Sequence, residues 1–156
     1  VNQLHKWNDS EHWSLSFTDA HDLMQARDTS NNCSIKASLK TRMDASARFV
    51  LIVGNSTDSV TAGGCQLCKS YDSYLKYCVR SRSVDYRSYI KFECDKAVEA
   101  GIKIIVLYKA AKVEKVKCPE AVRYRGIHVP MCYRDNGKLY WDYNSVKRAF
   151  DETDNC

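Results

Sequence analysis

Long hydrophobic runs are missing from this chain of 156 residues. The longest apolar run extends from Ile104 to Tyr108, far short of the roughly 20 residues that a membrane-spanning helix needs. Residues Val1 to Trp7 are polar and lack the apolar segment of a secretory signal peptide. We therefore expect a soluble, cytoplasmic protein that has no membrane partner.

A strong charge of one sign is also missing, because the net charge is only +5. The densest basic group, which is Arg80, Arg82 and Arg87, is interleaved with Asp85. A nucleic-acid interface normally shows a continuous basic face and a recognisable reading module, and the sequence has neither. We expect no nucleic-acid partner. The hydrophobic content of 44% instead indicates one folded domain with a substantial core.

Cysteine, in contrast, is abundant, with eight residues. Since no secretory signal is seen and the chain is long enough to build a core, we expect reduced thiols rather than disulfides. Cys65 and Cys68 form a C-x-x-C pair, which is a common half of a zinc site. A second pair and a nearby histidine are both missing. We therefore expect no metal ion, and a metal site at Cys65, Cys68 and Cys78 stays as the alternative.

Strand-like and helix-like segments alternate, which predicts a parallel sheet with crossover helices. Residues 48–53 and 102–108 are apolar on both faces and are expected in the covered interior of that sheet. Helices are predicted over 34–46 and over 88–100, where Ser88 caps the start and Gly101 ends the helix. Residues 13–18 alternate like a short strand, and 20–32 are expected to form a loop. Ligands of such sheets bind beyond the carboxyl ends of the strands.

The remaining segments complete one domain over residues 1–156. Residues 126–132 are expected as a strand near the sheet edge because Pro130 cannot donate to a ladder. Asn136 and Gly137 predict a turn, and 144–150 predict a closing helix. Residues 58–87 are long for a connection and are interpreted as an inserted subelement. Within it, four residues have the spacing of one face of a helix and predict a short amphipathic helix: Tyr71, Tyr74, Leu75 and Cys78.

Four stretches of the chain resemble the TIR-like family that includes the Thoeris antiphage sensor proteins. They are VNQLHKW at 1–7, SFTDAHDL at 16–23, SIKASLKTRMDASARFVLIVGNST at 34–57, and RSYIKFECDKAVEAGIKIIVLY at 87–108. The resemblance implies a three-layer, flavodoxin-like α/β fold with a parallel sheet and helices on both faces. The family's first strand is not seen before residue 1. Either the displayed chain lacks that strand or another segment fills its place.

The resemblance also implies an activity, because many TIR-type domains cleave NAD at the bond between nicotinamide and ribose. Glu93 matches the glutamate of the family's W-V-x-x-E motif and is the expected catalytic residue. NAD would be the substrate, with no further cofactor. The expected substrate-binding residues lie in the polar loops and at the start of the helix over 88–100: Asp19, His21, Asn55, Ser56 and Tyr89.

Each of these residues also has a plainer interpretation. Glu93 can be a surface glutamate paired with Arg87 or Lys96, and Asp19 can simply cap a turn. The alternative function is a non-catalytic module that self-associates or contacts a signalling partner. The tyrosines of residues 58–87 favour that alternative, since tyrosine is enriched at protein interfaces.

Overall fold

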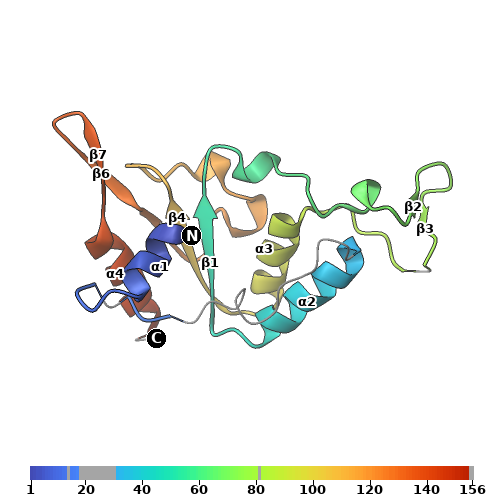
Figure 1. Ribbon diagram of the computed structural model, residues 1–156, viewed down its shortest axis with the longest axis horizontal. Helices are drawn as coiled ribbons and strands as arrows, with labels where there is room; N and C mark the ends of the chain where they lie inside the picture. The colour runs from blue at the N-terminus through green and yellow to red at the C-terminus, as the bar shows by residue number, and fades with distance from the viewer. Residues whose placement is uncertain (14, 18–30, 81, 155–156) are drawn as a thin grey trace.

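A parallel three-stranded sheet forms the centre of the molecule (Figure 1). The computed structural model describes residues 1–13, 15–17, 31–80 and 82–154. The strands of the sheet are β1 (Arg48–Val53), β4 (Lys103–Tyr108) and β5 (Ile127–Pro130), in the order β1-β4-β5. Both pairings are parallel, and β1 is in register with β4 along its whole length. The predicted parallel α/β architecture is confirmed.

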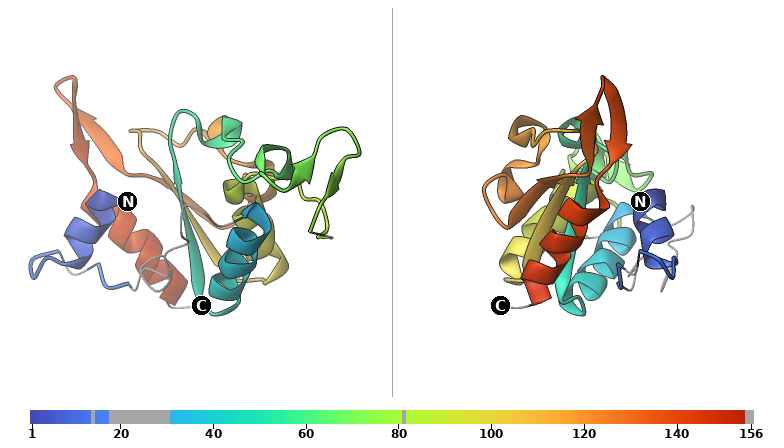
Figure 2. Two further views of the ribbon diagram at one scale, coloured as in Figure 1. Left: turned by 45° about the vertical axis from the view of Figure 1, so that its right-hand side comes forward. Right: turned by 90° about the vertical axis from the view of Figure 1, so that its left-hand side faces the viewer.

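Helices cover both faces of this sheet, as the two views of Figure 2 show. One face carries the first and last helices, and the other carries the two middle helices. Their bounds are α1 (Asn2–Asn8), α2 (Asn32–Asp44), α3 (Tyr89–Glu99) and α4 (Tyr143–Asp154). Short 3₁₀ turns interrupt the loops at Thr57–Ser59, Cys65–Leu67, Lys115–Lys117 and Glu120–Val122. The three-layer arrangement agrees with the flavodoxin-like expectation.

The two hydrophobic cores meet on β4, because successive side chains of a strand point to opposite faces. Ile105 and Leu107 pack with α1 and α4. Ile104, Val106 and Tyr108 pack with α2, α3 and the turn at Glu120–Val122. All five side chains are buried. This strand is therefore the one on which the position of every helix depends.

Two predicted helix signals are confirmed at the ends of α3. The backbone N–H of Lys91 donates to Ser88 Oγ over 3.2 Å, which satisfies one of the donors left open at a helix start. Gly101 follows the helix with φ of +64°, the left-handed conformation that ends many helices. Residues predicted as a helix therefore become one for the expected physical reasons.

The prediction that β1 lies in the interior of the sheet is wrong for the described residues, where its one strand partner is β4. β4 takes the central place instead. The side chains of β1 are correspondingly less buried than those of β4. The apolar character of β1 on both faces is explained by its contacts, since Val50 and Ile52 reach one core while Leu51 and Val53 reach the other.

The helix predicted from Tyr71 to Cys78 is also wrong. This segment is a small hairpin of β2 (Tyr71–Asp72) and β3 (Tyr77–Cys78), drawn far from the sheet in Figure 1. Asp72 Oδ1 accepts hydrogen bonds from the backbone N–H groups of Tyr74 and Leu75 at 2.9 and 2.8 Å. Such side-chain bonds to the backbone favour a turn over a helix. Spacing alone could not reveal this competition.

Three further predictions concern residues 13–18, the turn at Asn136 and Gly137, and the loop over 20–32. The strand predicted over 13–18 is wrong for its described residues: Trp13 lies in a turn, and residues 15–17 have no strand assignment. Asn136 and Gly137 do form a turn, with positive φ at both residues, between β6 (Cys132–Asp135) and β7 (Lys138–Trp141). Most of the loop expected over 20–32 lies outside the described residues, and Asn32 already belongs to α2.

A buried lysine fastens the loop before α3 to α2. Lys36 is only 5% exposed, and its Nζ donates to the carbonyls of Arg87 and Asp85 at 2.6 and 3.2 Å. The same Nζ lies 3.3 Å from Asp85 Oδ1. Arg87 in turn pairs with Asp85 and with Asp95 of α3. This network holds residues 85–87 between the two helices.

The network makes stability depend on pH through Asp85. Burial pushes its pKa up, but hydrogen bonds from Arg87 and the charge of Lys36 outweigh burial and hold the pKa at about 2, below the ordinary 3.8. A carboxylate with a lowered pKa stabilises the fold above its unfolded pKa, and this stabilisation is lost as pH falls through the folded pKa. We expect Asp85→Asn to lower the free energy of unfolding by about 1–2 kcal/mol at neutral pH.

Urea unfolding measured from pH 7 down to pH 2 checks this expectation. The wild type should lose the extra stability between roughly pH 4 and pH 2, so the two curves should converge there. Asp135→Asn, at the exposed tip of the β6–β7 hairpin, is the control and should follow the wild type. Parallel curves for Asp85→Asn and the wild type would contradict the role of the network.

Candidate active site

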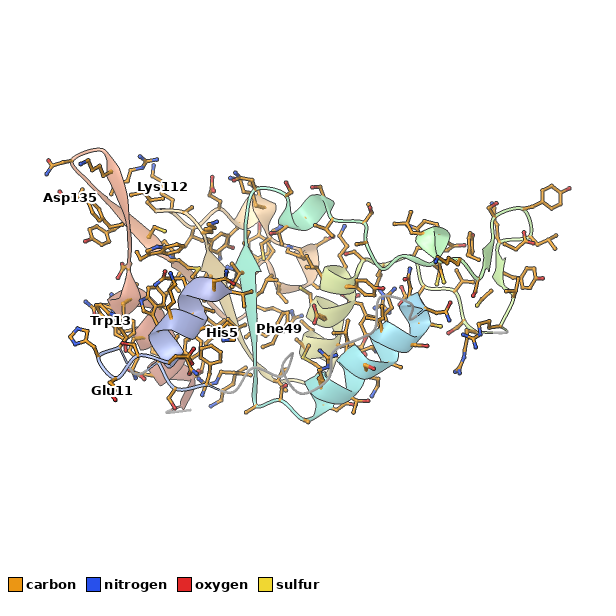
Figure 3. The ribbon with its side chains drawn as sticks, viewed as in Figure 1. His5, Glu11, Trp13, Phe49, Lys112 and Asp135 are labelled. Carbon is orange, nitrogen blue, oxygen red and sulfur yellow. The ribbon has the colours of Figure 1, made fainter. Side chains whose placement is uncertain are left out.

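A cavity of about 450 Å³ lies beside the edge of β1 that does not face β4. Figure 3 labels two of its lining residues, His5 of α1 and Phe49 of β1. Its volume is within the range of small-molecule sites. Five elements and three residues outside them supply the lining: Val1, Leu4, His5, Phe17, Leu39, Arg42, Met43, Ser46, Arg48, Phe49, Val50, Ile52, Glu93 and Phe150.

The cavity extends around the edge of β1 and reaches both layers of helices. Phe49 packs with the core of α2 and α3, whereas Val50 and Ile52 pack with the core of α1 and α4. All three residues line the cavity. Space beside a strand edge is bounded by backbone as well as by side chains, so this site offers polar groups within a mostly apolar wall.

Glu93 is the acidic residue of this lining. It lies on α3, whose neighbouring residues Phe92 and Cys94 are buried, and is itself half-buried. Arg42 lines the same cavity from the last turn of α2. Because α2 packs on α3, a carboxylate and a guanidinium are presented to one space from adjacent helices.

Aromatic rings form the opposite wall. Arg48, the first residue of β1, places its guanidinium 5.4 Å from the ring centroid of Phe150. Phe17 lies 6.1 Å from Phe150 and 5.7 Å from His5, measured between ring centroids. Rings at these separations attract one another and a nearby cation. The wall can therefore hold a flat, apolar or cationic group.

The structure does not bring the other described candidates into this cavity. Asn55 and Ser56 follow the carboxyl end of β1 and are exposed, and Asn55 Oδ1 accepts a hydrogen bond from Lys117 Nζ over 3.1 Å. The cavity lies alongside β1 rather than beyond Val53. Asp19 and His21 lie outside the described residues, so their predicted role is untested.

Tyr89 does not line the cavity and instead hydrogen-bonds to α2 and to the loop before α3. Its hydroxyl donates to Asn32 Oδ1 over 2.9 Å, and its backbone N–H donates to Ala62. A Cβ on Gly63 would lie 2.6 Å from the Tyr89 ring, so this close packing requires glycine. Burial raises the pKa of Tyr89, and the neighbouring thiols of Cys68 and Cys33 add to the effect.

Sequence reasoning missed the two arginines of the cavity. Arg42 lies three residues after Leu39 and directly before Met43, so helical spacing places it beside the buried face of α2. Arg48 opens an otherwise apolar strand. A cation at the boundary of an apolar face was the signal available, but nothing in the sequence showed that both residues lie near Glu93.

Two further properties concern the described part of the chain. None of its helices has both the length and the apolar character needed to cross a membrane. In its present side-chain arrangement, no set of three or more histidine, cysteine, aspartate or glutamate residues among those described is placed to hold a metal ion.

One comparison with known proteins bears on the family of this chain. The family model described as Thoeris protein ThsB, TIR-like domain, matches residues 1–62. The matched residues include α1, α2 and β1, and the match supports the TIR-like prediction. Glu93 lies outside the matched residues. No curated protein and no solved structure matches the chain.

The open space beside β1 can be tested by filling it. Val50→Phe should leave the free energy of unfolding within about 0.5 kcal/mol of the wild type, because the added ring can enter the cavity. Val106→Phe on β4 is the matched change in a fully buried position and should cost about 1–3 kcal/mol. Urea unfolding of both variants measures these free energies. Equal losses would mean that the edge of β1 is as closely packed as β4.

Proposed function

We propose that this TIR-like domain cleaves NAD to nicotinamide and an ADP-ribose-type signal, with Glu93 as the catalytic carboxylate. The observation that carries the proposal is the place of Glu93 on the wall of the 450 Å³ cavity, facing a space that Arg42 and aromatic rings also line. Glu93 is also the residue that matches the glutamate of the family's W-V-x-x-E motif.

The chemistry needs a carboxylate at this place. The bond between ribose C1′ and the nicotinamide nitrogen breaks, the nitrogen keeps the electron pair, and positive charge develops on the ribose. Glu93 stabilises this charge and holds the ribose hydroxyls, as a fixed charge in a partly dehydrated site does most effectively. Water then adds at C1′ and releases a proton, which gives ADP-ribose. Attack by the adenine of the same molecule would give a cyclic product.

The remaining wall suits the other parts of the substrate. Arg42 can bind the pyrophosphate through paired hydrogen bonds, which is the geometry that a guanidinium prefers. The rings of Phe17 and Phe49 can contact the flat nicotinamide or adenine. NAD is thus the substrate and no additional cofactor is needed. A role as a signal generator in bacterial defence follows from the family and belongs to the same proposal.

Nicotinamide release from NAD by the purified chain tests the activity. We expect Glu93→Gln to reduce kcat at least about 100-fold, because the neutral amide cannot offset the charge on ribose. Glu99→Gln is the matched control, since Glu99 is an exposed glutamate on the same helix that pairs with Lys96. Unfolding curves of both variants should match the wild type. Equal activity of Glu93→Gln and Glu99→Gln would sink the proposal.

Arg42 tests the orientation of the substrate. Arg42→Gln should raise KM for NAD about tenfold and change kcat less, since loss of a charge-assisted hydrogen bond to pyrophosphate costs about 1.5–3 kcal/mol. Arg134→Gln, on the exposed β6 strand, serves as the control and should leave KM unchanged. If KM for NAD stays unchanged in Arg42→Gln, the pyrophosphate binds elsewhere.

A non-catalytic interaction module is the second candidate, and the β2–β3 hairpin favours it. Tyr74 is 90% exposed and Leu75 is 62% exposed at its tip, and Tyr77 of β3 and Val79 directly after it are exposed as well. Exposed aromatic and aliphatic side chains in one patch are typical of contact surfaces. Absence of nicotinamide release at high protein concentration would make this the preferred function.

A further inference from the structure

The inserted segment lacks a hydrophobic core of its own. Within 61–80 and 82–86, the buried residues are two glycines and two cysteines: Gly63, Gly64, Cys65 and Cys78. Most of its large apolar side chains are exposed, and its strands β2 and β3 have two residues each. A hairpin of this size is at best marginally stable in water. Another interaction must therefore keep the segment in one conformation.

Four thiols gather where that interaction is needed. A cavity of about 10 Å³ is lined by cysteines from three parts of the chain: Cys33 of α2, Cys65 and Cys68 at the start of the 3₁₀ turn and directly after it, and Cys78 of β3. This is about the room that one water molecule occupies. It suits a single ion rather than a cluster of several atoms. The other described cysteines, Cys94, Cys118 and Cys132, lie in the two cores.

The backbone around these thiols is held by hydrogen bonds. The N–H of Cys68 donates to Cys65 O over 2.9 Å, which closes the C-x-x-C turn. The N–H of Tyr71 donates to Cys68 O over 3.0 Å, and Tyr71 pairs with Cys78 across the hairpin. The turn and the hairpin therefore keep three of the cysteines at fixed backbone positions.

A second set of bonds joins the start of α2 to this unit. Asn31 Oδ1 accepts from Ser70 Oγ over 3.0 Å and lies 3.8 Å from Cys68 Sγ. Asn32 Nδ2 donates to Gly64 O over 2.9 Å. Cys33 is the second residue of α2, where the helix dipole favours negative charge.

Polar and charged groups border the thiols. The backbone N–H of Asp85 donates to Cys65 Sγ over 3.2 Å. Arg82 lines the same cavity and adds a positive charge. Thiolates are the form in which cysteine binds metal.

We propose that Cys33, Cys65, Cys68 and Cys78 bind one Zn²⁺ ion and that this ion fastens the inserted segment to α2. Four thiolates around one ion are the common ligand set of a structural zinc site. The thiols do not converge as the side chains stand, so they must turn about χ1 toward the cavity when zinc binds. Binding releases the thiol protons to water, and the free energy of binding stabilises the segment. The proposal does not depend on NAD cleavage.

Zinc content of the full chain, purified in reductant with zinc present, tests the proposal. We expect about one zinc per chain in the wild type and in Cys94→Ala, whose thiol lies in the core between α3 and the sheet. After dialysis, the zinc content of Cys33→Ser and of Cys68→Ser should be lower than that of the wild type by a factor of about ten or more. Zinc below one tenth per chain in the wild type, or full zinc in Cys33→Ser, would overturn the four-cysteine site.

Titration of the wild type with Co²⁺ keeps the test independent of whether a variant folds. A four-thiolate site should give the thiolate-to-cobalt charge-transfer band and strong tetrahedral d–d bands, and one equivalent of Zn²⁺ should abolish them. Cys33 and Cys68, the two partly exposed thiols of the proposed site, should then resist a thiol reagent until a chelator is added. A cobalt spectrum without thiolate bands would refute the proposal. So would two disulfides among these cysteines in zinc-free protein that does not take up zinc after reduction.

Discussion

The burial of β4 on both of its faces is the constraint on which the rest of the structure depends. Alternate side chains of this one strand enter two different cores, so α1 and α4 are positioned by Ile105 and Leu107, while α2 and α3 are positioned by Ile104 and Val106. β1 also sends alternate side chains into the two cores, but it is paired on one edge only. That edge pairs with β4, and the other edge borders the cavity. The candidate active site is therefore a consequence of sheet order: the space exists where an apolar strand has a single described partner.

Elements whose cause is local could be predicted from the sequence. β4 is a continuous apolar run, and α3 carries its own cap at Ser88 and its own stop at Gly101, so no distant contact was needed to recognise them. The hairpin at 71–78 shows the opposite case. Its apolar spacing fits a helix, yet the side chain of Asp72 hydrogen-bonds the following backbone and the segment has no core against which a helical face could pack. Periodicity predicts a helix only where something buries its apolar face.

Of the residues that line the candidate site, Glu93 could be predicted from the sequence and the residues around it could not. Glu93 could be selected because a family motif fixes it by local spacing on one helix. Arg42 and Phe17 reach the same cavity from an earlier helix and a loop, and their meeting depends on how those segments pack. Asn55 and Ser56 were expected from the rule that ligands bind beyond strand ends. In this sheet Asn55 and Ser56 lie beyond the end of β1, while the cavity runs along the strand. The cavity is therefore not at the position that the rule gives for a ligand.

The four thiols of Cys33, Cys65, Cys68 and Cys78 and the candidate active site are linked through the starts of two helices. Tyr89 begins α3, and its hydroxyl bonds Asn32 at the start of α2, the residue that also holds Gly64 beside the C-x-x-C turn. Lys36 then ties α2 to the loop before Ser88. Glu93 follows Tyr89 by four residues, about one helical turn. Anything that fixes the thiols to α2 therefore also fixes the start of α3, and with it the direction from which Glu93 approaches the cavity. The inserted segment can thus act on the geometry of the site without contributing a residue to it.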